Sequence, residues 1–210
     1  NMVFDEVNII DIDKKKIKTN NFSFQYDKLV LSPGIQLDYS NIEGLNNMKN
    51  NSIYTAWKAG EETKKLAEEI RKLQNNDNIV VTIPLSPYRC PPGPYERISL
   101  IADYIKRNNL KAKIIVLDAN QKIVSKGSLF KKAWDEFYSD IIFYYADNQI
   151  RSIDIEERKI FTDFEEFNYK IANIIPNQKA PDLLLNAGLI ENGRKWAPVN
   201  PYDFTSKFSK

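Results

Sequence analysis

The sequence predicts an α/β fold, and three adjacent segments carry the prediction. Residues 79–83 and 113–117 are continuous apolar runs, typical of strands buried on both faces of a parallel sheet. Between them, residues 95–107 repeat apolar side chains at three- and four-residue steps, which is the pattern of an amphipathic helix. A strand, a helix and a second strand in this order predict a βαβ unit.

The segment before this unit is expected to begin with short strands. Three strand-like runs separated by polar turns predict a small antiparallel meander: VFDEVNIIDID (3–13), KIKT (16–19) and FSFQY (22–26). KLVLS (28–32) then predicts a buried strand, which leads into a turn at Pro33 and Gly34. Gly34 permits either a plain turn with positive φ or the close approach of a ligand to the backbone, and the sequence leaves both open.

Periodicity predicts the remaining elements of the chain. Apolar residues recur at helical steps over residues 56–73, and a second amphipathic helix is expected at 127–138. Apolar runs, some with the short spacing of hairpins, predict strands at 141–145, 149–154, 159–162 and 170–175. A short helix is expected at 182–187, just before Gly188.

The length of 210 residues suits one large domain, or one domain together with pieces of another. Strand-like sequence starts at once, without an opening turn or cap, so the chain is expected to begin inside a fold. The apolar strand at 79–83 is expected to open a new domain. The predicted organisation is a first segment 1–75, a middle domain 76–190 and a final segment 191–210.

Composition excludes several classes of function. The net charge of +2 is too small to indicate a nucleic-acid surface, and no apolar stretch is long enough for a membrane span. The absence of histidine excludes His-based triads and His-ligated zinc sites. A single cysteine excludes an internal disulfide and a CxxC metal site. We therefore expect no nucleic acid, membrane span or metal site in this chain.

The turn after the first strand of the βαβ unit differs from a dinucleotide-binding turn. Such a turn reads GxGxxG, because glycines let backbone N–H groups approach a pyrophosphate, and an acid at the end of the second strand binds ribose. Asp118 stands at the acid position, but residues 84–94 contain five prolines and one glycine. Proline has no N–H to donate. The sequence therefore predicts that no NAD(P) binds here and that Asp118 has a structural role.

Cys90 is the candidate reactive group of this turn. It lies beside Arg89 and shortly before the helix start expected near Tyr95, and both features favour a thiolate. The neighbouring prolines fix its position, so we expect a partly accessible thiol, with an inert buried cysteine as the alternative. Glu96 follows six residues later and is a candidate for proton transfer, or else for capping the helix.

Several motifs resemble those of one family of flavoproteins. The most specific is RCPPGPYER (89–97). The resemblance extends through nearly the whole chain by way of YDKLVLSPG (26–34), AWKAG (56–60), FKKAW (130–134), IANIIPNQKA (171–180) and WAPVNP (196–201). These motifs resemble the flavoprotein subunit of flavocytochrome c sulfide dehydrogenase, a relative of glutathione reductase and sulfide:quinone oxidoreductase.

The resemblance implies a Rossmann-like FAD/NAD(P)-binding fold, made here of a partial FAD domain and a degenerate NAD(P)-like domain. It implies a periplasmic enzyme that oxidises sulfide at a cysteine pair beside FAD and passes electrons to a c-type cytochrome subunit. On this resemblance the first redox cysteine corresponds to Cys90 and the base to Glu96. Pro33 and Gly34 match the turn that passes close to the flavin.

The sequence departs from the family pattern in two ways. The second redox cysteine of the family stands in a WCPV-type motif, whereas this chain has Ala197 within WAPV (196–199), so no disulfide with Cys90 can form. The glycine-rich N-terminal FAD turn and the C-terminal Gly-Asp FAD motif have no counterpart in the chain. We therefore expect the central part of a longer flavoprotein, which by itself retains neither FAD nor activity.

The leading hypothesis is thus a fragment of a sulfide-dehydrogenase-like FAD oxidoreductase. Two alternatives stay open on the sequence. One is a flavoprotein that acts on another small reductant, with Cys90 as a relic. The other is a non-catalytic domain that binds a cytochrome or another subunit.

Overall fold

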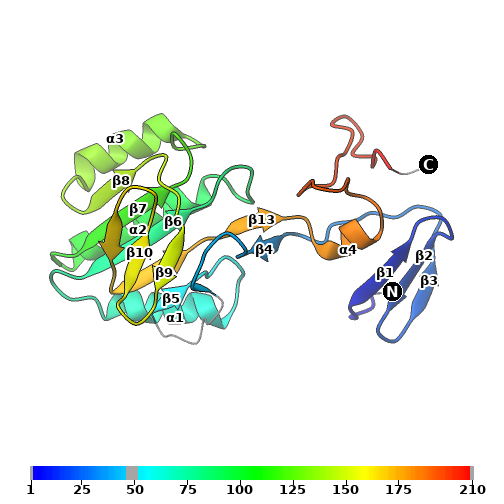
Figure 1. The fold of residues 1–210 in the computed structure, drawn as a ribbon, viewed down its shortest axis with the longest axis horizontal. Coiled ribbons are helices and arrows are strands. Elements are labelled where there is room, and N and C mark those ends of the chain that lie inside the picture. The colour runs from blue at the N-terminus through cyan, green and yellow to red at the C-terminus, as the bar shows by residue number, and fades with distance from the viewer. Residues whose placement is uncertain (1, 46–51, 209–210) are drawn as a thin grey trace. The chain divides into compact units, whose positions relative to one another are not determined.

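The computed structural model describes residues 2–45 and 52–208. The chain forms two compact units, and Figure 1 shows its course through their elements. One unit is Asp38–Asn177, and the other combines Asn1–Leu37 with Gln178–Lys210. Each unit has a hydrophobic core of its own.

A five-stranded parallel sheet forms the centre of the unit Asp38–Asn177. In the order of the sheet its strands are β5 (Ile53–Tyr54), β12 (Ile171–Ile174), β6 (Asn78–Ile83), β7 (Lys113–Asp118) and β8 (Ile142–Tyr145). Val80 in the central strand β6 lies opposite Ile115 of β7 and Ala172 of β12. The predicted α/β class and the predicted βαβ unit are therefore confirmed.

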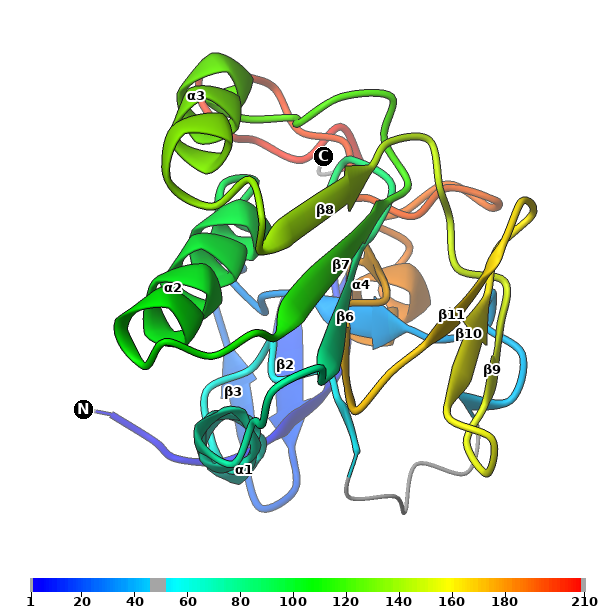
Figure 2. The ribbon, with the colours of Figure 1, turned by 90° about the vertical axis from the view of Figure 1, so that its left-hand side faces the viewer.

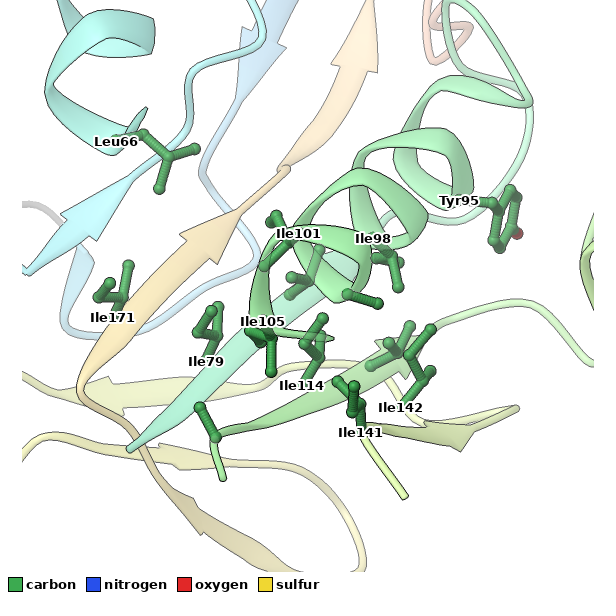
Figure 3. Packing of buried hydrophobic residues seen from close by; sticks show 14 of the residues in the cluster. Leu66, Ile79, Tyr95, Ile98, Ile101, Ile105, Ile114, Ile141, Ile142 and Ile171 are labelled. Atoms are coloured by element: carbon green, nitrogen blue, oxygen red, sulfur yellow. The ribbon is translucent and has the colours of Figure 1, made fainter. Parts of the chain in front are cut away.

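Three helices cover one face of this sheet, as Figure 2 shows: α1 (Glu61–Arg71), α2 (Gly93–Arg107) and α3 (Gly127–Phe137). Figure 3 shows Ile98, Ile101 and Ile105 of α2 packed over Ile79 and Ile114 of the neighbouring strands. All five side chains are excluded from water or nearly so. This packing explains why the helical repeat of α2 was readable in the sequence.

A three-stranded antiparallel sheet covers the opposite face. Its strands, in order, are β11 (Glu166–Asn168), β10 (Lys159–Phe161) and β9 (Ser152–Asp154). Ile153, Ile160 and Phe167 from these strands share a second core with Val80 and Ala172 of the parallel sheet. Both faces of the central strand are thus covered, which accounts for its continuous apolar sequence.

The other unit begins with the predicted antiparallel meander. It consists of β1 (Val7–Asp11), β2 (Lys16–Thr19) and β3 (Ser23–Gln25). Helix α4 (Asp182–Asn186) and the residues after it contribute Leu184, Leu189 and Ile190 to a small core. Strands β4 (Gln36–Asp38) and β13 (Asn177–Lys179) pair with each other at the two points where the chain passes between the units.

Two predicted elements differ from the structure. KLVLS (28–32) is not a strand, because no strand in the described part of the chain pairs with it, and Val30 is 89% exposed. Helix α1 begins at Glu61 rather than at residue 56. Ala56 has a φ of 47° and Gly60 a φ of 152°, and neither value occurs in a right-handed helix.

The structural units divide the chain after residues 37 and 177, whereas the sequence places its boundaries near 75 and 190. Strand β5 and helix α1 consequently belong to the same unit as the parallel sheet. The assignment of the segments to an FAD domain and an NAD(P)-like domain stays a prediction.

Among the described residues, no helix combines the length and the apolar character needed to cross a membrane.

Candidate active site at the start of helix α2

Residues 84–94 form the turn after β6, which we call the proline turn. This turn lies at the topological switch point of the parallel sheet. From β6 the chain crosses to β7 on one side, whereas β12 pairs with the other side of β6. Open α/β sheets bind their ligands at the carboxyl ends of strands at such a point. Helix α2 begins inside the turn, at Gly93.

Cys90 is exposed on this turn, three residues before α2 begins. Its φ of 60° lies in the left-handed region, and its carbonyl accepts a 2.9 Å hydrogen bond from the Gly93 N–H. A Cβ at Gly93 would lie 3.1 Å from the Cys90 Sγ and 3.0 Å from the indole of Trp57. The thiol and the indole therefore both border the space that a side chain at Gly93 would take, and they leave little room for one. The accessible thiol that we expected is confirmed.

Asp118, at the end of β7, is completely buried and accepts four hydrogen bonds. Its Oδ2 accepts from the hydroxyl groups of Tyr95 (2.7 Å) and Tyr144 (2.8 Å). Its Oδ1 accepts from the backbone N–H (2.9 Å) and the side-chain amide (2.7 Å) of Asn120. Both carboxylate oxygens are thus occupied by protein donors, and the structural role predicted for Asp118 is confirmed.

The same network ties down both ends of the proline turn. At the first end, the Asn120 Oδ1 accepts from the Ser86 N–H (3.0 Å), and the Asn120 amide donates to the Pro84 carbonyl (2.9 Å). At the second end, Tyr95 lies in the first turn of α2 and donates directly to Asp118. Cys90 lies between these two attachments.

Burial raises the pKa values of three phenols around this network. For Tyr88, burial raises the pKa to about 12. The Tyr88 hydroxyl donates to the Pro91 carbonyl (3.2 Å) and interacts with Tyr95. Burial also raises the pKa values of Tyr95 and Tyr144, and their hydrogen bonds to Asp118 raise both further. All three phenols therefore stay protonated at neutral pH and remain hydrogen-bond donors.

The proline turn does not fit a dinucleotide. A pyrophosphate needs several free backbone N–H groups, but five positions of the turn are proline. The N–H groups of Ser86 and Gly93 already bind protein acceptors. A ribose hydroxyl would have to displace one of the donors that occupy the buried carboxylate of Asp118. We therefore assign no nicotinamide chemistry to this turn.

We predict that neither NADH nor NADPH binds this chain with micromolar affinity, because five positions of the turn have no N–H to donate and Asp118 is closed off by its partners. Isothermal titration calorimetry of the folded chain with each nucleotide is the measurement, with buffer injections as the control. Saturable heats at micromolar nucleotide would overturn this prediction.

Polar side chains from three elements, of which Asn173 is buried and Glu62 and Arg97 are half-buried, hold residues 55–57 next to the turn. The carboxylate of Glu62 on α1 accepts from the first two N–H groups of this segment (2.7 and 3.0 Å). Arg97 on α2 donates to the Ala56 carbonyl (2.6 Å) and to the Asn173 Oδ1 on β12 (2.9 Å). The guanidinium also stacks on the indole of Trp57, 5.1 Å from its centroid. Burial lowers the pKa of Arg97. The arrangement fixes the indole that meets Cys90 at Gly93.

Comparison with known families decides the identity of this fold. The model of the sulfide dehydrogenase (flavocytochrome c) flavoprotein chain, central region, matches residues 63–176, which is more than half of the chain. The chain belongs to this family. The match includes Cys90, the whole proline turn and the Asp118 network.

Solved structures, among them FAD/NAD(P)-binding Rossmann-type oxidoreductases, share the fold. A pyridine nucleotide-disulfide family oxidoreductase from Enterococcus faecalis V583 is 14% identical with a TM-score of 0.67, and 94% of this chain covers 44% of it. A NAD-dependent persulfide reductase from A. fulgidus is 16% identical with a TM-score of 0.59, at coverages of 88% and 33%. A chain from the mitochondrial ATP synthase of Tetrahymena thermophila is 17% identical with a TM-score of 0.64, at coverages of 94% and 52%. The sulfide dehydrogenase family member described here thus spans about half or less of each of these chains.

The other site residues predicted from the sequence lie in both units. Glu96 is exposed in the first turn of α2, in the same unit as Cys90. Pro33 and Gly34 are exposed in the other unit, where Gly34 has a φ of 75° and no atom within 4 Å of the place of a Cβ. Ala197 packs against the small core of that same unit. Among the described residues, no group of three or more His, Cys, Asp or Glu side chains is placed to hold a metal.

Sequence reasoning missed the residues that fix the site. It identified Asp118 but none of its partners, and it placed Trp57 on a helix that in fact begins four residues later. One signal was available: Asn120 follows the strand-ending Asp118 by two residues, a spacing at which an amide can bind the preceding carboxylate and backbone. The roles of Arg97 and Asn173 had no local signal.

Proposed function

We propose that this chain is the central part of a flavin-dependent sulfide dehydrogenase in which Cys90 captures sulfide. The observation that carries the proposal is the exposed thiol on a turn held at both ends, at the switch point of the sheet. Membership of the flavocytochrome c sulfide dehydrogenase flavoprotein family supports it. The activity is proposed for the full-length protein, because the chain spans only part of the solved oxidoreductases that share its fold.

In the proposed reaction, the Cys90 thiolate and a hydrosulfide ion form a sulfur–sulfur bond. The S–H bond of hydrosulfide breaks, and the two sulfur atoms together lose two electrons and one proton. The product is a persulfide on Cys90. Glu96, exposed in the same first turn of α2, is the residue proposed to carry the proton.

Since Ala197 replaces the second cysteine, turnover must use one thiol. An external thiolate attacks the outer sulfur of the persulfide, the sulfur–sulfur bond breaks, and the Cys90 thiolate leaves. The outer sulfur departs as a persulfide of the external thiol. This step moves no net electrons, so all oxidation occurs in the first step.

FAD bound by the full-length protein would supply a two-electron acceptor for the first step. The open backbone at Pro33 and Gly34 is the part of this chain proposed to lie near it. A c-type cytochrome is the proposed final acceptor and the periplasm the proposed location, both by analogy with the family.

The test is anaerobic addition of sodium sulfide to the full-length protein, followed by the visible absorption of its flavin. We expect sulfide to bleach the flavin of the wild type, and Cys90→Ser to slow bleaching by at least about 100-fold, because the sulfur acceptor is lost. Mass spectrometry of the wild type should find an added sulfur atom on Cys90.

Two controls sharpen this test. Dithionite should bleach the Cys90→Ser flavin as completely as the wild-type flavin, which separates loss of chemistry from loss of cofactor. Glu96→Gln should slow the reaction with sulfide, while Glu136→Gln, which changes another exposed glutamate, on α3, should leave its rate unaltered. A Cys90→Ser protein that reacts with sulfide at the wild-type rate would refute the proposal.

A second candidate function is a non-catalytic subunit that binds other proteins. Two observations favour it: alanine at the position of the second cysteine, and the similarity of the fold to a chain of the Tetrahymena thermophila ATP synthase structure. Full-length protein that purifies without flavin would favour this candidate over the enzyme.

A further inference from the structure

The proline turn is tied to the sheet through one buried carboxylate. Asn120, bound to Asp118 Oδ1, holds Ser86 near the start of the turn. Tyr95, bound to Asp118 Oδ2, lies immediately after its end. Asp118, Asn120 and Tyr95 are buried, so water competes little for their hydrogen bonds, which define the geometry of the turn.

Cys90 needs such support, because its backbone conformation is unfavourable by itself. A non-glycine residue with a φ of 60° persists only where the surrounding structure imposes it. Within the turn, the Gly93 N–H donates to the Cys90 carbonyl and the Tyr88 hydroxyl donates to the Pro91 carbonyl. Further constraints come from the two attached ends.

We propose that Asp118 is the positioning residue of Cys90: through Asn120 and Tyr95 it holds both ends of the proline turn and thereby fixes the thiol beside Gly93 and Trp57. In a dinucleotide-binding unit an acid at this point of the sheet faces a ligand. Here Asp118 binds Asn120 and Tyr95 instead of a ligand, and these two residues hold the proline turn. The assignment rests on the proposed function and extends it, since it names the residue that positions the Cys90 thiol for the reaction with sulfide.

The chain offers a matched pair of variants for the test. Tyr95→Phe and Tyr144→Phe each remove one hydroxyl that donates to the same Asp118 oxygen, at 2.7 and 2.8 Å. Only Tyr95 adjoins the proline turn, because Tyr144 lies on β8. Tyr95 also accepts a longer bond from the Val124 N–H (3.3 Å). Asn120→Ala releases the opposite end of the turn and serves as a second, independent variant.

The measurement is the rate at which iodoacetamide alkylates Cys90 in the folded full-length protein, with thermal melting to verify folding. We expect Tyr95→Phe and Asn120→Ala to speed alkylation by about fivefold or more, because a released turn no longer keeps Gly93 and Trp57 against one side of the sulfur. Tyr144→Phe should stay within about twofold of wild type. Hydrogen exchange should show loss of protection at the Gly93 N–H in the first two variants only.

The outcomes separate positioning from general stability. If all three variants change alkylation in proportion to their loss of thermal stability, or if none changes it, Asp118 does not position Cys90. Flavin bleaching by sulfide is measured in parallel and should slow in Tyr95→Phe but not in Tyr144→Phe. A wild type that fails to react with sulfide would refute the proposed function, while the alkylation and exchange results would still decide the positioning role.

Discussion

Replacing Asp118 by alanine is expected to lower the free energy of unfolding of the unit Asp38–Asn177 by about 4 kcal/mol or more, since each buried donor left without an acceptor costs about 1 to 3 kcal/mol. Four donors lose their acceptor at once: two tyrosine hydroxyls and two N–H groups of Asn120. The position is completely buried, so water can replace the carboxylate only by entering the core. Urea denaturation followed by circular dichroism measures this loss.

Two further variants show which part of the effect is polar. Asp118→Asn keeps the size of the side chain and one acceptor oxygen, so we expect about half of the loss seen with alanine. Asp163→Ala removes an exposed carboxylate that binds Arg151 and should change stability little. Equal effects of Asp118→Ala and Asp163→Ala would mean that the buried network contributes nothing to the fold.

Much of the parallel sheet could be predicted from the sequence, because its central strands are covered on both faces and read as apolar runs. β6, β7 and α2 were located within two residues of their observed ends. Short strands could not be located in this way. β5 has two residues, and its pairing partner Ala172 lies more than a hundred residues further along the chain. Such a strand is defined by pairing, which a local pattern does not encode.

The chemistry of the candidate site was predictable only in part. The composition of the proline turn was enough to locate Cys90 and to exclude a phosphate cradle. The network around it depends on tertiary contacts: only the folded sheet brings Tyr144 to Asp118 and Asn173 to residues 54 and 55. Local side-chain bonds also overrode helix propensity at residue 56, where Glu62 binds the backbone N–H groups of Thr55 and Ala56.

Arg97→Met is expected to lower the free energy of unfolding of the same unit by about 3 kcal/mol, because hydrogen bonds to a charged group contribute about 1.5 to 3 kcal/mol and buried acceptors are left without donors. The guanidinium bridges the Ala56 carbonyl and the Asn173 side chain, and it stacks on Trp57. Methionine fills much of the same space but donates nothing, so the loss reports mainly the hydrogen bonds and the stacking. Urea denaturation of the unit is again the measurement.

Lysine and a surface arginine provide the controls for this change. Arg97→Lys keeps the positive charge but cannot donate in two directions from a planar group, so it should recover only part of the stability lost with methionine. Arg107→Met, at the exposed end of the same helix, breaks a surface ion pair with Asp103 and should have little effect. Because Arg97 fixes the indole that meets the thiol at Gly93, its loss should also speed the alkylation of Cys90. If Arg97→Met is as harmless as Arg107→Met, residues 55–57 are held by Glu62 and Asn173 without help from the guanidinium.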